Sequence, residues 1–388
     1  AQWTVDTLPP NTFHSITGAP RTFNGKVIIG NGGADAAQRG FVTAYDQATG
    51  RQLWRFYTTP GKPGDDAGDA VMEMAARTWS GEYWKAGGGG GTVWNGITFD
   101  AELNRIYLGT GNGGPYNPRV RSPGGGDNLF LASIVALDAD TGKYAWHYQV
   151  NPGEAWDYKA TANMITATLM IDGRARKVLM QAPTNGFFYV IDRETGKLIS
   201  AEKTGKVTWA ERIDLATGRP VEAPDIRYEK GETILWPSML GTHNWQDMSY
   251  NPLTGLVYIP YMQLAARYST DVKPGELNFG GIKLEPWKAD AADGTGAVLA
   301  WDPVAQRPRW KVPLETIWNG GTLTTAGLLV FHGAGDGWFS AYDAADGRRL
   351  WRFDAGLGIV GAPISYAAGD TQYVSVLVGY GGTTAALS

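Results

Sequence analysis

The most constraining feature of the sequence is a short motif that recurs five times. A small or apolar residue and one further residue precede an Asp, and a turn and an outer segment follow it. The five aspartates are Asp46, Asp138, Asp192, Asp302 and Asp343. Four copies carry a tryptophan eight residues after the Asp, at Trp54, Trp146, Trp310 and Trp351, whereas the copy at Asp192 has Ser200 there. Chance would produce this coincidence with odds on the order of one in 10⁵, so the repeat is real.

Each copy of the motif predicts a β-hairpin. The Asp caps its own backbone in the turn, a glycine such as Gly50 or Gly142 provides the corner, and the outer strand ends in the tryptophan. The spacing from Asp302 to Asp343 is 41 residues, about the length of one four-stranded propeller blade. We therefore expect an all-β fold, a β-propeller of four-stranded blades in which the tryptophans dock one blade on the next.

The wider gaps between motifs hold insertions or blades whose motif has decayed. Residues 60–90 break the period and carry the one short helical pattern, and residues 114–128 form a second excursion rich in Gly and Pro. Residues 201–240 and 262–295 are longer and polar. Excursions of this length on a rigid scaffold often line a binding face.

Composition excludes several classes of function. The net charge is −4 and no basic run is present, which disfavours nucleic acid and anionic membrane surfaces as partners. No apolar segment approaches the roughly 20 residues that span a bilayer. Cysteine is absent, so these residues hold no disulfide, thiolate metal site, catalytic thiol or CxxCH haem attachment. The four histidines, at 14, 147, 243 and 332, show no metal-ligand spacing and are expected to be structural.

A glycine run marks a candidate binding site. Gly87 to Gly91 lead into Thr92-Val93-Trp94, which we interpret as a short β-type segment, and a second strand is expected over residues 104–109 before Gly111-Asn112-Gly113. Because glycine has no Cβ, such a run can adopt positive φ and lie close against a flat partner. An indole directly after it can offer its face to that partner. From these residues alone, a flexible loop followed by a core tryptophan remains equally open.

Nine segments together resemble one known family, in family order. They are ITGAP (16–20), GNGGAD (30–35), GGGTVW (89–94), GTGNG (109–113), SPGGGDNLFLASIVALD (122–138), PGEAWDY (152–158), QAPTNGFFYVIDR (181–193), HNW (243–245) and NGGTLTTAG (319–327). The chain resembles the propeller domain of the alcohol dehydrogenases that depend on pyrroloquinoline quinone (PQQ), specifically the soluble quinohaemoprotein type. The resemblance implies an eight-bladed propeller with PQQ and a divalent cation on its axis. Residues 1–388 would then be a single domain with about five to six blades, incomplete at both ends and without a haem domain.

The resemblance also implies a catalytic base and a metal site. Asp157, in Trp156-Asp157-Tyr158, matches the base that takes the hydroxyl proton of the alcohol while hydride moves to the quinone. Asp35 and Asn112 match the protein ligands of the cation, which Asp157 adjoins. Carboxylate and amide oxygens are hard donors that suit Ca²⁺. Outside their motifs, Asp157 and Asn112 would be ordinary turn residues.

Further positions align with residues that contact the quinone. Trp94 matches the tryptophan stacked against the ring, and Thr92 matches a hydrogen-bond donor to it. The remaining aligned positions are Thr17, Gly33, Ala34, Asn244, Trp245 and Trp318. Taken singly, Trp245 and Trp318 suit ordinary core packing as well.

The sequence departs from the family pattern at several positions. Asp35 stands where the family usually has Glu, and Thr184 stands where a Lys usually reaches the reactive carbonyl of the quinone. Loss of that cation should weaken catalysis unless another takes its place, and Lys159 is one candidate. Lys159 also argues against a lanthanide, because lanthanide-using relatives have a carboxylate there. The family's adjacent cysteines and its early arginine and glutamate are absent from these residues.

Two classes of function follow. The leading expectation is an enzyme that oxidises alcohols to aldehydes and passes electrons to a cytochrome c, in the periplasm by family habit. The alternative is a non-catalytic propeller, either an inactive relative or a scaffold for protein partners like the outer-membrane assembly lipoproteins. Convergence of Asp35, Trp94, Asn112 and Asp157 on one site would favour the enzyme. A complementary chain or self-association is expected to close the propeller, because open blade edges invite pairing.

Overall fold

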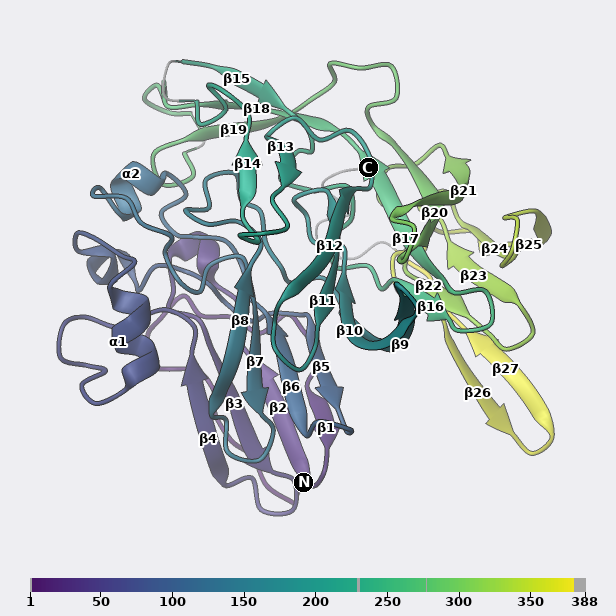
Figure 1. Cartoon of the computed structure of the whole chain (residues 1–388), viewed down its shortest axis with the longest axis horizontal. Coiled ribbons are helices and arrows are strands. Elements are labelled where there is room, and N and C mark those ends of the chain that lie inside the picture. Colours follow the sequence, from purple (N-terminus) through teal and green to yellow (C-terminus); the bar gives the residue numbers. More distant parts are fainter. Residues whose placement is uncertain (1, 229–230, 277, 380–388) are drawn as a thin grey trace.

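The computed structural model describes residues 2–228, 231–276 and 278–379, and most of its strands form four-stranded antiparallel sheets (Figure 1). The first sheet contains β1 (Arg21–Phe23), β2 (Lys26–Gly30), β3 (Phe41–Asp46) and β4 (Gln52–Tyr57). The second contains β5 (Ile97–Asp100), β6 (Arg105–Gly109), β7 (Ser133–Asp138) and β8 (Tyr144–Gln149). The third contains β9 (Ile165–Ile171), β10 (Arg174–Gln181), β11 (Phe187–Asp192) and β12 (Leu198–Lys203).

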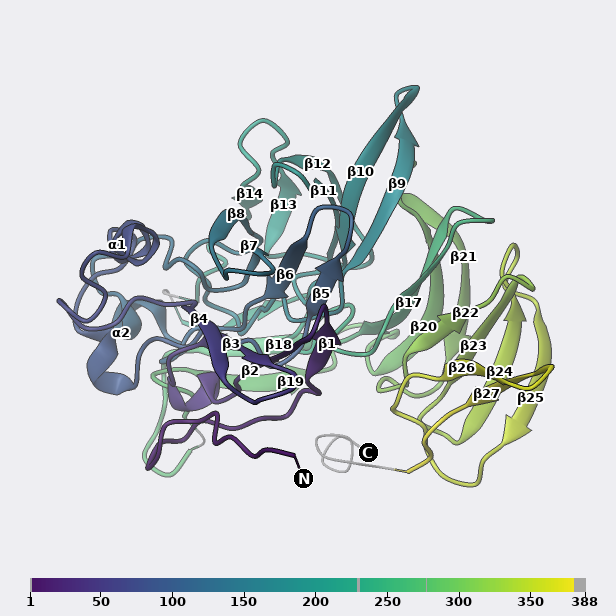
Figure 2. The ribbon, with the colours of Figure 1, turned by 90° about the horizontal axis from the view of Figure 1, so that it is seen from below.

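Two more sheets of this kind follow. The fourth contains β16 (Ser249–Asn251), β17 (Leu256–Gln263), β20 (Thr295–Asp302) and β21 (Arg307–Leu314). The fifth contains β22 (Thr322–Thr324), β23 (Leu329–Gly333), β24 (Trp338–Asp343) and β25 (Arg349–Asp354). We call these sheets the first to fifth blades. They follow one another around the molecule in sequence order (Figures 1 and 2), which confirms the predicted all-β propeller of four-stranded blades.

The remaining elements lie in the excursions and after the fifth blade. A two-stranded sheet contains β13 (Ala210–Ile213) and β14 (Pro220–Glu222), and a three-stranded one contains β15 (Thr233–Leu235), β18 (Ala265–Ser269) and β19 (Lys283–Trp287). The hairpin of β26 (Ile364–Ala368) and β27 (Thr371–Ser375) follows the fifth blade. The helices are short: α1 (Ala70–Ala76), α2 (Pro118–Arg121) and the 3₁₀ turns η1 (Ala34–Ala36) and η2 (Tyr83–Ala86).

The helix predicted within residues 60–90 is α1, whose N-cap Asp69 accepts hydrogen bonds from the amides of Val71 and Met72. The second helix, α2, was not predicted. The helix begins with a proline at its first position and is capped by Asn117, which is a typical helix-start signal. A helix of four residues is too short to show an apolar periodicity, so the sequence pattern did not reveal it. Across the described ranges, every helix falls short of the length and apolar character that a bilayer crossing requires.

The tryptophan rings of one blade pack directly against turn glycines of the next blade. A Cβ on Gly142 would come within 2.5 Å of the Trp54 ring, and a Cβ on Gly196 within 2.6 Å of Trp146. Trp310 covers Gly347 in the same way. Gly142 has a φ of 69°, a left-handed conformation that glycine adopts without a steric penalty. The predicted docking role is confirmed for Trp54, Trp146 and Trp310.

The copy of the motif that lacks tryptophan meets the copy that lacks glycine. Ser200 lies in β12, the last strand of the third blade, and the neighbouring turn of the fourth blade has Gln306 at the corner position, with a φ of 52°. The Gln306 Nε2 donates a 2.8 Å hydrogen bond to the Ser200 Oγ. A side-chain hydrogen bond therefore replaces the ring-on-glycine contact at this interface.

Trp351 differs from the other motif tryptophans, so the expected docking role is wrong for it among the described residues. Its side chain is 48% exposed. It packs within its own blade, against Phe353 in a stacked pair and against Phe339 edge to face. Leu350 and Leu357 nearby in sequence are exposed as well. The outer side of the fifth blade thus presents uncovered apolar side chains.

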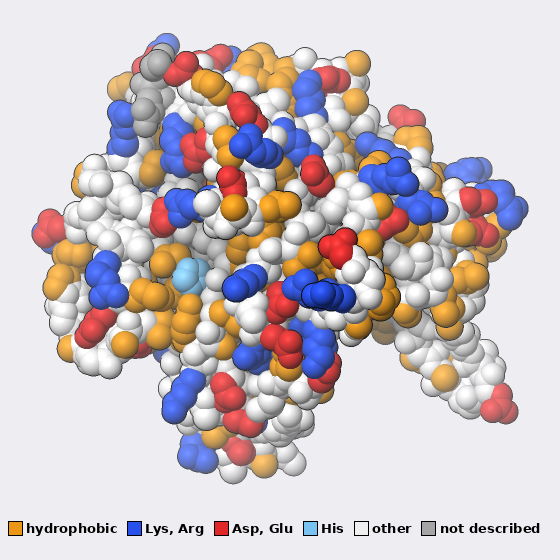
Figure 3. Space-filling view, viewed as in Figure 1, with side chains coloured by type: hydrophobic (Ala, Val, Ile, Leu, Met, Phe, Trp, Pro, Cys, Tyr) orange, Lys and Arg blue, Asp and Glu red, His pale blue; other side chains and the backbone are white. Residues whose placement is uncertain are grey.

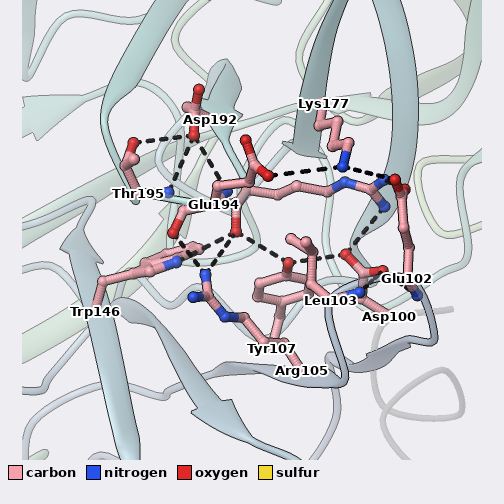
Figure 4. Close-up of polar contacts among 11 residues, drawn as sticks. Asp100, Glu102, Leu103, Arg105, Tyr107, Trp146, Lys177, Asp192, Glu194 and Thr195 are labelled. Carbon is pink, nitrogen blue, oxygen red and sulfur yellow. Dashed lines mark hydrogen bonds and ion pairs between the residues drawn. The ribbon is translucent and has the colours of Figure 1, made fainter.

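A buried polar cluster fastens the second blade to the third (Figure 4). The Arg193 guanidinium pairs with the Asp100 carboxylate at 3.0 Å and with Glu102. The backbone carbonyl of Arg193 accepts hydrogen bonds from the Tyr107 hydroxyl at 3.1 Å and from the Trp146 indole at 3.3 Å. Because Arg193 and Asp100 are both buried, this ion pair is shielded from water and fixes the relative position of the two blades.

The strand order places every predicted site residue at one end of the blades. Neighbouring strands run antiparallel, so successive connections alternate between the two ends of a sheet. The turns that carry the motif aspartates lie at one end. The β2–β3, β4–β5, β6–β7, β8–β9 and β10–β11 connections lie at the other, together with the long excursions. We call this second end the site end.

Candidate cofactor and metal site

The glycine run is a structured part of the site end. All five glycines from Gly87 to Gly91 have positive φ. Gly90 forms a β-bridge with Gly113, the Gly91 amide donates to the Asn112 carbonyl at 2.9 Å, and the Gly111 amide donates to the Thr92 carbonyl at 2.9 Å. A Cβ on Gly90 would come within 2.5 Å of the Asn112 carbonyl oxygen. The glycines are therefore required for close backbone packing, and a flexible loop is not what the structure shows.

The strand expected at Thr92-Val93-Trp94 is wrong in detail. These residues lie outside any assigned strand, and β5 begins only at Ile97. The reason is that their partners are the irregular residues around Asn112, so only single hydrogen bonds form and no regular ladder. The second expected strand, over residues 104–109, corresponds to β6, which spans Arg105–Gly109.

The structure brings Asp35 and Asn112 together. Asp35 lies in η1, held between Gly33 and Ala37, both of which have positive φ. Its Oδ1 accepts hydrogen bonds from the Tyr116 hydroxyl at 2.6 Å and from the Asn112 side-chain amide at 3.3 Å. Asn112 itself is buried. A carboxylate from the first blade and an amide from the second thus meet at the site end.

Asp157 is the third member of this group. It is buried, has a φ of 62°, and its Oδ1 lies 2.9 Å from the Lys159 Nζ. Burial raises the pKa of Asp157 to about 7, Lys159 opposes that rise, and the negative charge of Asp35 adds to it. The pKa of Tyr116 is raised well above the ordinary value. Burial is the largest cause, and the negative charges of Asp157 and Asp35 add to it. Asp35 therefore contacts both Asn112 and Tyr116, and Asp157 lies within electrostatic reach of Asp35 and Tyr116.

These oxygens suit a hard divalent cation. Within residues 2–228, 231–276 and 278–379, no cluster of three or more His, Cys, Asp and Glu side chains is placed to hold a metal. The predicted set is different, because it combines two carboxylates with one amide. That combination is the chemistry Ca²⁺ prefers, and a cation there would favour the ionised form of Asp157.

The residues predicted to contact a quinone occupy two places. Thr17 and Trp94 line one small cavity, where the backbone of Gly18 lies against that of Trp94. Thr92 is fully buried, and its Oγ1 has no hydrogen-bond partner among the described residues. Such an orphaned buried hydroxyl is costly and suits a contact with a polar ligand. Gly33 and Ala34 lie in the η1 turn beside Asp35.

Trp245 and Trp318 form the second place. Their rings meet edge to face with centroids 5.9 Å apart, and the buried Trp318 Nε1 finds no acceptor in the described part of the chain. Asn244 is buried, and its amide is used locally by the Leu240 carbonyl and the Trp245 backbone. Core packing therefore accounts for much of this group, while the indole N–H of Trp318 remains available to a ligand.

Lys159 and Thr184 are direct neighbours. The Lys159 amide donates to the Thr184 Oγ1 at 2.8 Å, and the Thr184 amide donates to the Lys159 carbonyl at 3.3 Å. The Lys159 ammonium is largely buried against Asp157. A cation thus stands beside the position where the family pattern would place one, contributed by a different residue.

Sequence reasoning missed two residues of this site, Glu154 and Tyr116. Both are buried; Tyr116 donates a hydrogen bond to Asp35, and Glu154 accepts from the backbone amides of Trp156 and Tyr158 on either side of Asp157. Each lies within a segment already singled out, Glu154 in PGEAWDY and Tyr116 in the excursion 114–128. The available signal was that a charged or phenolic side chain stood in a segment otherwise rich in Gly and Pro.

The fold and the site define a class of protein: a propeller of four-stranded blades whose site end carries two carboxylates and an amide suited to a cation, and a cavity lined by Trp94 and glycines. Residues 4–208 and 287–374 match the family described as PQQ, glucose/ethanol/alcohol dehydrogenase, β-propeller domain. The chain belongs to this family.

Relatives with the same architecture are known. The quinohemoprotein alcohol dehydrogenase ADH IIB of Pseudomonas putida is 56% identical over 387 residues, which cover 98% of this chain and 56% of that protein. The solved structure of ADHIIG from Pseudomonas putida HK5 has a TM-score of 0.92 at 47% identity, over 98% of this chain and 58% of that one. A europium-containing methanol dehydrogenase has a TM-score of 0.83 at 34% identity, over 94% of this chain and 65% of that one. The chain thus spans about half the length of the curated relatives it matches.

Proposed function

We propose that this chain is the catalytic propeller of a periplasmic PQQ-dependent alcohol dehydrogenase, with Ca²⁺ at Asp35, Asn112 and Asp157, and with a cytochrome c as electron acceptor. The observation that carries the proposal is the hydrogen bond between Asp35 and Asn112, with the buried Asp157 carboxylate near enough for the charge of Asp35 to raise its pKa. When bound, PQQ supplies the hydride acceptor and Ca²⁺ supplies Lewis-acid polarisation.

Asp157 acts as the general base in this proposal. Its carboxylate takes the hydroxyl proton of the alcohol, a task that needs a group whose pKa lies near the working pH. Burial raises the pKa of Asp157 to about 7, and the Lys159 ammonium at 2.9 Å favours the ionised form. The positive backbone φ of Asp157 indicates that the surrounding structure holds the backbone of this residue in place.

Lys159 compensates for Thr184 in the same proposal. A cation near the reacting carbonyl stabilises negative charge as it develops. Thr184 cannot provide one, but the hydrogen bonds between the Thr184 and Lys159 segments hold the Lys159 side chain in the same neighbourhood. The quinone would be bound by Trp94 and by the other aligned residues, namely Thr17, Gly33, Ala34, Thr92, Asn244, Trp245 and Trp318.

The non-catalytic scaffold is the weaker candidate. A scaffold does not require the site residues to interact with one another. In this structure, however, Asp35 is hydrogen-bonded to Asn112, and the negative charge of Asp35 raises the pKa of Asp157. One observation does favour a protein partner: Trp351, Phe353 and Leu357 are each about half exposed on or beside the last strand of the fifth blade. We propose that a complementary chain or a second copy covers this face to close the propeller.

The test is reconstitution of the purified chain. With PQQ and Ca²⁺ added, we expect the quinone absorbance to remain with the protein after gel filtration and primary alcohols to reduce an artificial dye. Chelation of Ca²⁺ should abolish both signals, and a Trp94→Ala variant should lose quinone retention. Sedimentation of the same samples reports whether closure by association accompanies binding. Failure of the well-folded chain to retain quinone in the presence of Ca²⁺, whether it sediments as a monomer or as an assembly, would refute the proposal.

A further inference from the structure

Glu154 is a buried carboxylate that neither the motif pattern nor the proposed chemistry uses. It lies in the β8–β9 connection, three residues before Asp157, and is 1% exposed. Its Oε1 accepts hydrogen bonds from the amides of Trp156 at 2.6 Å and Tyr158 at 2.9 Å, which flank Asp157 on both sides. Its Oε2 accepts a hydrogen bond from the Gly113 amide at 3.3 Å. One side chain therefore links the segment of Asp157 to the segment of Asn112.

The backbone of Asp157 needs such support. Its φ of 62° is in the left-handed region, which a residue with a side chain adopts less readily than glycine. A carboxylate that accepts the amides before and after this residue fixes the turn, because charge-assisted hydrogen bonds are the stronger kind. The bond to Gly113 adds a second restraint, from the neighbouring blade.

Arg121 provides the matching positive charge. Its guanidinium is fully buried and donates to backbone carbonyls of both segments, at 2.5 Å to Glu154, at 2.8 Å to Pro115 and at 3.1 Å to Tyr116. Burial lowers the pKa of Arg121, and the negative charge of Glu154 opposes that lowering. The negative charge of Glu154 and the positive charge of Arg121 thus offset each other inside the protein. The hydrogen bonds described above join these side chains to backbone groups rather than to a ligand.

We propose that Glu154 is a positioning residue that sets the separation between Asp157 and Asn112, and hence the geometry offered to the cation and to the alcohol. Glu154 is not a ligand or a base itself, since both of its oxygens are engaged by backbone amides. This inference rests on the proposed function for its catalytic consequence. The mechanical link between the two segments does not depend on that function.

The first test needs no variant. Native-state hydrogen exchange at rising denaturant should show the amides of Gly113, Trp156 and Tyr158 opening with the same free energy, because one carboxylate holds all three. Glu154→Gln then separates the contacts. The carboxamide oxygen can still accept from Trp156 and Tyr158, but the amide nitrogen faces the Gly113 N–H and cannot accept from it.

For Glu154→Gln we expect faster exchange in residues 109–116, with residues 154–160 little changed. Calorimetry should show Ca²⁺ affinity reduced about 10–100-fold, the usual effect of losing an outer hydrogen bond around a metal site. In the reconstituted enzyme, kcat should fall while KM for the alcohol stays within about twofold, since the base is displaced and the alcohol pocket is not.

The matched control is Gln181→Met. The Gln181 amide is also buried and donates to the carbonyls of Ala160 at 2.5 Å and Ala162 at 2.8 Å, on the far side of Asp157 in the same connection. This variant removes buried hydrogen bonds without touching Gly113, so exchange in 109–116 and Ca²⁺ affinity should remain as in the wild type. The inference would be overturned if the Gly113 amide in Glu154→Gln exchanged at the wild-type rate. It would also be overturned if residues 109–116 and 154–160 opened independently in the wild-type protein. If the wild-type chain binds no Ca²⁺ or quinone, the proposed function fails while the exchange result still decides the link.

Discussion

At the residue scale, the proposed site consists of Asp35, Asn112 and Asp157, with Tyr116 and Glu154 bonded to them or to the backbone around them. Asp35, Asn112 and Asp157 stand in motifs specific enough to name them, and the structure places the first two in contact and the third within their electrostatic reach. The sequence could mark Glu154 and Tyr116 as unusual side chains in their segments but not give their roles, because these depend on contacts between residues 41 and 81 positions apart. A spacing pattern within one segment contains no information about such contacts.

His332 gives a residue-scale prediction of pH dependence. It lies buried on β23, and burial lowers its pKa to about 4. Above about pH 6.5 the histidine is neutral in both the folded and the unfolded chain. Between pH 6.5 and pH 4 only the unfolded chain binds the proton, so the free energy of unfolding should fall by about 1.4 kcal/mol per pH unit.

From pH 7 to pH 5, this one residue should therefore lower the unfolding free energy by about 2 kcal/mol. Urea unfolding of the wild type and of His332→Leu at both pH values measures the effect. The variant should lose less stability than the wild type on acidification. An equal loss in both proteins would show that His332 does not contribute.

At the element scale, the repeat could be recognised in the sequence because each hairpin has the same turn and packs its outer strand in the same way. The spacing from Asp to Trp is fixed by the turn and the outer strand, so four tryptophans and the hairpins were predictable. The pairing of each tryptophan with a glycine of the next blade was not, since it joins two separate copies. The Ser200–Gln306 hydrogen bond joins the copy without tryptophan to the copy without glycine.

Gly142→Ala tests the docking of one blade on the next. A Cβ there would lie 2.5 Å from the Trp54 ring, so the ring must move, and overpacking of this kind costs about 1–3 kcal/mol in addition to the strain of positive φ. Gly173→Ala is the matched control, because Gly173 has a φ of 73° but no atom within 4 Å of a Cβ. It should cost only the backbone strain of about 1 kcal/mol. Equal shifts of the urea midpoint in the two variants would contradict the docking account.

At the scale of the whole molecule, antiparallel connectivity brings residues from many positions in the chain to one end. Thr17, Trp94, Asp157, Asn244 and Trp318 all lie in connections at the site end, which follows from strand order and could be predicted once the blades were recognised. The exposed face at Trp351 could not be predicted, because the Asp–Gly–Trp motif there is the same as in the copies whose tryptophan docks on the next blade. On the face shown in Figure 3, acidic and basic side chains are interspersed, as expected for a net charge of −4 without a basic run.

The central claim is that the site end performs alcohol oxidation with Asp157 as its base, and Asp157→Asn tests it most directly. The amide keeps an oxygen for the cation but cannot take a proton. Quinone content and dye-linked alcohol oxidation should be measured on the same reconstituted sample, with the wild type alongside. We predict quinone content like that of the wild type and turnover reduced at least about 100-fold, the contribution typical of a general base. Turnover that survives the substitution while quinone remains bound would contradict the account.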